Sequence, residues 1–205
     1  MALALFAMGV AAYVFFTGPH DLSRYPDRER SPYKLPWPAG VTRLCGQSNR
    51  GIVSHRGWEN YAYDFSMPVG SEVCAARSGW VSQIDVSHDG HGLRAPNNFI
   101  RVVHTDLTKG SYLHLQKGGS LVRPGQWVEQ GQVIARSGHV GRSLAPHLHF
   151  HVVGARTIPV TFADVPKHFG SPRMGFFYTS GNTPPSPKKS DPTADTTQIK
   201  TAPPP

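Results

Sequence analysis

Three histidines alternate with apolar residues in the segment Pro146-His147-Leu148-His149-Phe150-His151. Residues two apart in a β-strand project from the same face, so two or three of these imidazoles can approach one metal ion. Imidazole is a common zinc ligand, and a catalytic zinc site usually combines three protein ligands with an open position for water. The alternative is the polar face of a surface strand, and the alternation alone leaves both interpretations open.

A second segment, upstream, could supply the remaining ligands. Between residues 61 and 66, aromatic residues alternate with small or polar ones, which predicts a strand with Asp64 on its polar face. His55 precedes this strand. Together with one imidazole of the later strand, His55 and Asp64 would form a mixed nitrogen and oxygen ligand set of the kind that suits zinc.

Several motifs carry a resemblance to a known family. They are the His55 and Asp64 pair, Pro68–Val73 with Ala75–Val81, Tyr112-Leu113-His114-Leu115, Gly125–Ile134 and Pro146–Phe150. In this order, from about Ser54 to Val153, they resemble the lysostaphin/LytM-type zinc metalloendopeptidases. Separate motifs that agree in their order are a more specific signal than any one of them.

The resemblance implies a role for each of five residues. Carried over residue by residue, it makes His55, Asp64 and His149 the ligands of one zinc ion, with His114 and His147 beside the metal-bound water. Zinc would lower the pKa of that water and polarise the scissile carbonyl. The two remaining histidines would accept a proton or stabilise the oxyanion.

Two features depart from the family pattern. The spacer between His55 and Asp64 is long and contains Glu59, which could be a carboxylate ligand or a general base. Asp64 is favoured because the family's Asp-Phe-x-x-Pro-x-Gly context follows it. His151 stands where the family usually has an acid or an amide. A shifted pair of histidine ligands remains open, but a role behind the ligands or at the surface is favoured for His151.

The resemblance also implies a substrate, the stem or cross-bridge peptides of peptidoglycan, and hence the bacterial cell envelope, periplasmic or extracellular, as the location. One alternative is a noncatalytic LytM-like regulator that binds and activates another cell-wall hydrolase. Such proteins typically lack zinc ligands, which this chain retains. A lipoyl-type hairpin over residues 122–134 would leave the histidines unexplained. Nucleophilic catalysis is disfavoured, because the chain has no Gly-x-Ser-x-Gly and its cysteines lie in no Cys/His protease signature.

The formal net charge is +8 and the isoelectric point is about 9.8. Such a charge attracts anionic polymers, including wall glycans, lipid headgroups and nucleic acid. No dense basic helix, known nucleic-acid module or stacking motif is present, so no nucleic-acid partner is expected. Two cysteines, Cys45 and Cys74, are too few for a disulfide scaffold, but an exported chain could join them in one bridge.

The elements that position these residues are expected to be strands. Short β-branched and aromatic runs, separated by glycine-rich turns, cover residues 80–86, 99–104, 111–115, 133–137 and 147–153. This spacing favours antiparallel β structure over alternating helix and strand. We therefore expect a mainly β single domain of antiparallel sheet, and the resemblance adds a substrate groove walled by loops.

Composition divides the chain into four expected parts. They are a signal peptide or short membrane anchor (1–17), a Pro-rich linker (18–38), the metallopeptidase domain (39–180) and a disordered tail (181–205). The first part is apolar and uncharged but short for a membrane span, and any membrane association would run through it. The tail is rich in Pro, Thr and Lys and has little apolar material to bury.

Overall fold

The computed structural model describes residues 22–51 and 53–184. The strands within them are β1 (Thr42–Gln47), β2 (Tyr63–Ser66), β3 (Glu72–Cys74), β4 (Gly79–Asp85), β5 (Phe99–Val103), β6 (Lys109–Leu113), β7 (Leu115–Ser120), β8 (Trp127–Val128), β9 (Val133–Ser137), β10 (His147–Val153), β11 (Thr157–Ile158) and β12 (Phe177–Thr179). Short 3-10 helices are η1 (Leu22–Arg24), η2 (Arg28–Arg30), η3 (Gly57–Glu59) and η4 (His168–Gly170). The strands expected at 133–137 and 147–153 coincide with β9 and β10.

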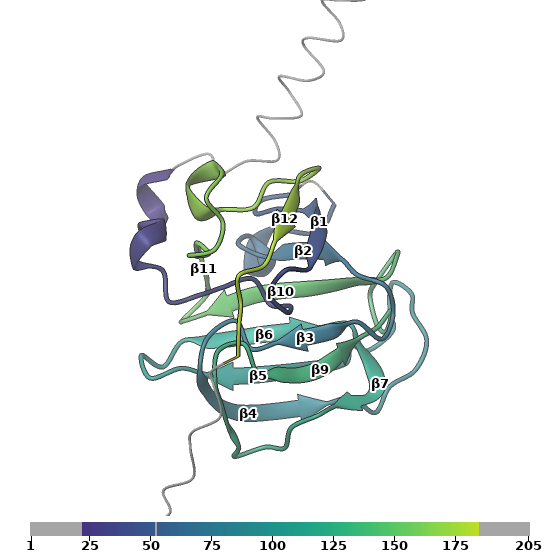
Figure 1. Ribbon diagram of the computed structural model, residues 1–205. Helices are drawn as coiled ribbons and strands as arrows, with labels where there is room; N and C mark the ends of the chain where they lie inside the picture. Colours follow the sequence, from purple (N-terminus) through teal and green to yellow (C-terminus); the bar gives the residue numbers. More distant parts are fainter. Residues whose placement is uncertain (1–21, 52, 185–205) are drawn as a thin grey trace, which may run out of the picture.

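These strands form two sheets (Figure 1). The large sheet has the order β12-β1-β2-β10-β6-β5-β4-β8, with β11 paired to β10, and the small sheet has the order β3-β9-β7. Every pair of named strands is antiparallel. The expected mainly β, antiparallel fold is therefore confirmed. In Figure 1, β10 lies between β2 and β6, so three segments far apart in sequence are neighbours at the centre of the large sheet.

The alternation in β10 divides its side chains between two faces. Leu148 and Phe150 are fully buried in the hydrophobic core, which also contains Val73 and Ile134 of the small sheet. Because successive strand residues point to opposite faces, the histidines of β10 lie on the other side of the sheet. The apolar residues anchor the strand, and the histidines are thereby held on a rigid element.

The sequence favours one strand over residues 111–115, but the structure divides this segment at His114. The preceding strand, β6, belongs to the large sheet, whereas the following strand, β7, belongs to the small sheet. His114 has a φ of 63°, in the left-handed region that residues other than glycine seldom adopt. The chain thus changes sheets at His114, which turns its imidazole away from the direction that strand alternation would give it.

The packed unit extends beyond the expected domain limits of 39 and 180. Tyr33, Leu35 and Trp37 are buried in the core, although they fall in the segment expected to be a linker. Asn182, expected in the tail, is also buried, and its side-chain amide donates to the carbonyls of Leu35 and Ala75. Apolar and hydrogen-bonding side chains at both ends explain the difference. The expectations for residues 1–17 and for the tail beyond 184 lie outside the described residues.

Cys45 and Cys74 are free and buried, so the structure contains no bridge between them. Burial, followed by the charge of Glu72, raises the pKa of the Cys74 thiol to about 12. Both facts argue against a reactive thiol. In the part of the chain that the structure describes, no helix has the length and apolar character needed to cross a membrane.

Candidate metal centre

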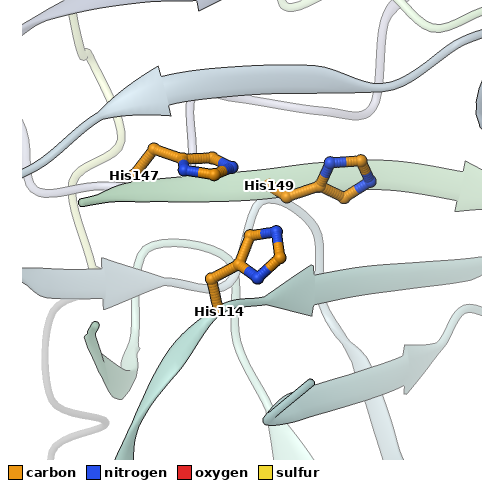
Figure 2. Close-up of side chains that lie close together, drawn as sticks. All are labelled: His114, His147 and His149. Atoms are coloured by element: carbon orange, nitrogen blue, oxygen red, sulfur yellow. The ribbon is translucent and has the colours of Figure 1, made fainter. Parts of the chain in front are cut away.

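Strand register brings the predicted site residues together. In the β10–β2 ladder His149 is paired with Asp64, and in the β10–β6 ladder it is paired with Leu113, the neighbour of His114. Cross-strand partners have closely spaced side chains on the same face of a sheet. Figure 2 shows His147 and His149 side by side on β10, with the side chain of His114 close to both. The pairing of β10 with two other strands is therefore what assembles the site.

The carboxylate of Asp64 lies at the centre of this cluster. Its Oδ1 atom is 2.8 Å from His149 Nδ1, 3.1 Å from His55 Nε2 and 3.5 Å from His147 Nε2. The side chains offer two groups of possible metal-ligand atoms, and within each group the atoms lie within 4.8 Å of one another. One group is His55, Asp64 and His149, and the other is His114, His147 and His149. All five residues expected at the site are thus in one place, and His149 belongs to both groups.

Backbone carbonyls orient three of the imidazoles. The Nδ1 atoms of His55, His114 and His147 lie 2.8, 2.9 and 2.8 Å from carbonyl oxygens. The carbonyls belong to Ser48, Val140 and Ala145. A carbonyl oxygen can only accept a hydrogen bond, so each Nδ1 carries a proton and donates it. In the neutral ring, Nε2 then has a lone pair and no proton. Fixing one nitrogen in this way leaves the other available as a metal ligand.

The lone pairs of His55 and His147 face the Asp64 carboxylate, and two acceptors in contact need a cation or a proton between them. His55 shows this need most clearly. The residue is fully buried, and its Nε2 atom has no hydrogen-bond partner among the described residues, although Asp64 Oδ1 is only 3.1 Å away. A buried polar nitrogen without a partner costs free energy, about 1–3 kcal/mol. Two imidazoles and one carboxylate are ligands that zinc accepts, so the residues fit a zinc ion.

The ionisable groups of the cluster shift one another's pKa values. Burial opposes ionisation of Asp64, but the neighbouring imidazoles of His147, His149 and His55 outweigh it and hold the pKa of the carboxyl well below its usual range. Burial likewise disfavours charge on His147, but Asp64 outweighs it and raises the pKa of that imidazole. Burial, with the nearby His147 and His149, lowers the pKa of His114 to about 3. At neutral pH, Asp64 is therefore an anion and His114 is neutral.

The sequence left Glu59 and His151 open as alternative metal ligands, and the structure places both outside the two ligand groups. His151 Nδ1 lies 3.0 Å from Nε2 of His149, on the ring nitrogen that does not face Asp64. His151 is therefore behind His149, and it is in neither donor group. Glu59 lines the groove over the site, but it too is absent from both groups of possible metal ligands found among the described residues.

The site opens into a groove of about 380 Å³. One wall is formed by the segment around Val53 and Glu59, and a second wall by the loops that carry Leu93 and Arg142. The two loops of the second wall are joined to each other, since Gly92 N donates to Gly141 O and Gly141 N donates to Gly90 O. The expected loop-walled groove is present, with the histidines and Asp64 on its floor.

No sequence motif predicted a role for Gln47, which lies close to the site. The side-chain amide of Gln47 donates to Asp64 Oδ2 at 2.9 Å. No motif distinguishes this glutamine from the other glutamines of the chain, because its role depends on contacts with residues that follow it by seven and seventeen positions.

A groove floored by a half-buried carboxylate and convergent imidazoles is the arrangement expected of a metal-dependent hydrolase. Residues 58–160, half of the chain, match peptidase family M23. The chain therefore belongs to peptidase family M23, and the resemblance inferred from the motifs is confirmed. The matched range contains Asp64, His114, His147 and His149, and His55 lies just before it.

Peptidoglycan DD-endopeptidase ShyB of Vibrio cholerae is 37% identical over 116 residues, which are 56% of this chain and 24% of that protein. Lysostaphin of Staphylococcus staphylolyticus is 35% identical over 116 residues, 56% of this chain and 20% of that protein. The chain spans about a quarter or less of the length of these curated relatives. The crystallised catalytic domain of lysostaphin from Staphylococcus simulans has a TM-score of 0.40 and 27% identity, covering 69% of this chain and 84% of that chain.

Proposed function

We propose that this protein is a zinc-dependent endopeptidase that hydrolyses peptide bonds in the stem or cross-bridge peptides of peptidoglycan. The observation that carries the proposal is the convergence of imidazole nitrogens on Asp64 Oδ1 at the floor of an open groove. Membership of peptidase family M23 supports the reaction type.

The proposed zinc ligands are His55 Nε2, Asp64 Oδ1 and His149 Nδ1. This set is preferred to His114, His147 and His149 because it includes a carboxylate and satisfies the buried, unpartnered nitrogen of His55. A zinc ion held there would act as a Lewis acid on a peptide carbonyl and would acidify water. The set supplies three protein ligands, which is the usual number for a catalytic zinc site.

His114 and His147 have a different proposed task. Each keeps Nδ1 on a backbone carbonyl, so Nε2 is the atom available to the substrate. A neutral Nε2 can accept a proton, and the protonated ring can donate a hydrogen bond to the oxyanion that forms on the scissile carbonyl. Because the carbonyl contacts fix both rings before substrate binds, little reorganisation is needed during the reaction.

The groove has features that suit a peptide substrate. Val53, Leu93 and Leu144 line it and are largely exposed, and Glu59 and Arg142 add one charge of each sign to the lining. The relatives support the substrate class, since ShyB carries the name peptidoglycan DD-endopeptidase. We accordingly propose the bacterial cell envelope, periplasmic or extracellular, as the location. Residues 1–17 remain the proposed signal peptide or membrane anchor, and 39–180 the core of the proposed metallopeptidase domain.

The test is release of muropeptides from purified sacculi by the zinc-loaded full chain. Asp64→Ala removes the proposed carboxylate ligand, and His114→Ala removes a proposed catalytic imidazole while leaving all three ligands. We expect soluble products from the wild type alone, and the product masses identify the bond that is cut. A folded wild-type chain that binds zinc and releases nothing would contradict the proposal and favour the noncatalytic regulator.

A further inference from the structure

Gln47 lies beside the proposed ligands without being one of them. It is the last residue of β1 and is paired with Asp64 in the β1–β2 ladder, after an irregularity in the register. The residue is 5% exposed, so the amide must find its hydrogen-bond partners within the protein.

All four hydrogen-bonding positions of this amide are used. Nε2 donates to Asp64 Oδ2 and to Ser54 Oγ, each at 2.9 Å. Oε1 accepts from the backbone N–H groups of Val53 and Ser54, at 3.0 and 3.3 Å. Exchanging the amide oxygen and nitrogen would set N–H against N–H and oxygen against carboxylate. The orientation of the amide is therefore determined by its neighbours.

The first consequence concerns the carboxylate. Gln47 occupies Oδ2 of Asp64, whereas the imidazoles of His55, His147 and His149 all face Oδ1. The carboxylate cannot rotate without breaking the bond from Gln47. A carboxylate held in this way offers a single oxygen to a metal ion.

The second consequence concerns the segment that carries His55. Gln47 Oε1 holds the two residues immediately before His55, and the carbonyl of Ser48, next to Gln47, accepts from His55 Nδ1. The loop folds tightly over the glutamine, since a Cβ atom at Gly51 would clash with the Gln47 side chain. The same amide thus ties the loop of one proposed ligand to the carboxylate of another, across a spacer that is otherwise long.

We propose that Gln47 is a positioning residue of the metal centre, which sets the distance between His55 and Asp64 and keeps Asp64 a one-oxygen ligand. The proposal rests on the proposed function, because it presumes zinc on these two residues. Partners that orient metal ligands typically contribute about 10- to 100-fold to metal affinity.

The experiment compares Gln47→Met with a matched control, Gln130→Met, in the full chain. Gln130 also links two segments through its amide, which donates to the carbonyls of Pro32 and Ala76, but it lies outside the groove. Gln47→Met loses four part-buried hydrogen bonds, and Gln130→Met loses one part-buried and one exposed hydrogen bond, so both variants are expected to unfold at a lower temperature. Only Gln47 contacts a proposed ligand.

Zinc affinity is measured by competition with a chromogenic chelator, and the visible spectrum of the cobalt(II) form reports coordination number. We expect Gln47→Met to weaken zinc binding about 10- to 100-fold and to reduce the cobalt absorptivity, as Asp64 becomes free to bind through both oxygens. Gln130→Met should change neither. If Gln47→Met does not fold, Gln47→Asn takes its place, because its shorter side chain cannot reach the loop and Asp64 together.

Two negative outcomes are distinguishable. If wild type and the Gln47 variant bind zinc equally well with the same cobalt spectrum, the positioning role is wrong while the proposed function stands. If the folded wild type binds no zinc, the proposed function is wrong, and the role of Gln47 is wrong with it.

Discussion

The Nδ1 atom of His151 lies 3.0 Å from Nε2 of His149, on the side of the His149 ring away from Asp64. If His149 binds zinc through Nδ1, the proton of its neutral ring is on Nε2 and is donated to His151. Burial, with His149 and Arg101 nearby, lowers the pKa of His151 to about 3, so His151 is neutral and can accept. Contacts of this kind fix the tautomer of a ligand.

His151→Ala should therefore weaken zinc binding, by about 10- to 100-fold, since His149 loses the acceptor for its second nitrogen. His151→Glu restores an acceptor at the same position and should recover much of the affinity. The measurement is the zinc dissociation constant of each purified variant. Equal affinity in wild type and His151→Ala would show that the contact does not orient the ligand.

Metal binding and turnover should separate among the five site residues. Asp64→Ala removes a proposed ligand and should lose zinc as well as activity. His114→Ala should retain stoichiometric zinc and lose about 10²- to 10⁴-fold in turnover, the usual contribution of a general acid or base. Metal content by mass spectrometry and muropeptide release are measured on the same preparations. Loss of zinc in His114→Ala would instead support the ligand group of His114, His147 and His149.

The second wall of the groove can be disturbed without changing a proposed zinc ligand. Gly141 has a φ of 90°, and a Cβ atom there would clash with Asn97, so Gly141→Ala should separate the two loops of this wall. Gly125→Ala is the matched control: its φ is 79°, but its Cβ would meet nothing within 4 Å.

Both substitutions carry the left-handed backbone cost, about 1–2 kcal/mol, but only Gly141→Ala should raise the KM for peptidoglycan peptides. Zinc affinity should be unchanged in both. Steady-state kinetics with isolated muropeptides measure the difference, and an equal KM in the two variants would mean that the wall does not contact substrate.

A buried histidine outside the site should make stability depend on pH. Burial, with the charge of Arg77, lowers the pKa of His104 below its usual 6.5, while its Nδ1–H donates to the carbonyl of Ser78. The unfolded chain then binds a proton more readily than the folded chain. The contribution of His104 to stability is complete above about pH 6.5 and is lost as the pH falls below that value.

Thermal unfolding of the chain with EDTA present, at pH 8 and pH 5, tests this expectation. The variant His104→Asn retains a donor for Ser78 but does not titrate, so its unfolding temperature should fall less than that of the wild type between the two pH values. Because His114 and His151 also have lowered pKa values, the comparison of variant with wild type is what isolates His104. An identical pH dependence would exclude the effect.

The sequence by itself determined which types of residue form the site and where much of the β structure lies. Alternation is a local property, so the strand over residues 147–153 and its histidine face could be recognised without a structure. The motifs around His55, Asp64 and His114 identified the family, which the match over residues 58–160 confirms. Composition alone did not show that Trp37 and its neighbours, in the segment expected to be a Pro-rich linker, are buried in the core.

Only the tertiary structure decided how these residues meet. Strand pairing sets His149 opposite Asp64, and a change of sheet at His114 turns its imidazole into the site. The amide of Gln47 and the contact of His151 with His149 depend on residues brought together by that pairing. Such contacts follow from register and loop conformation, which are set by the packing of the whole domain, so no local pattern in the sequence could reveal them.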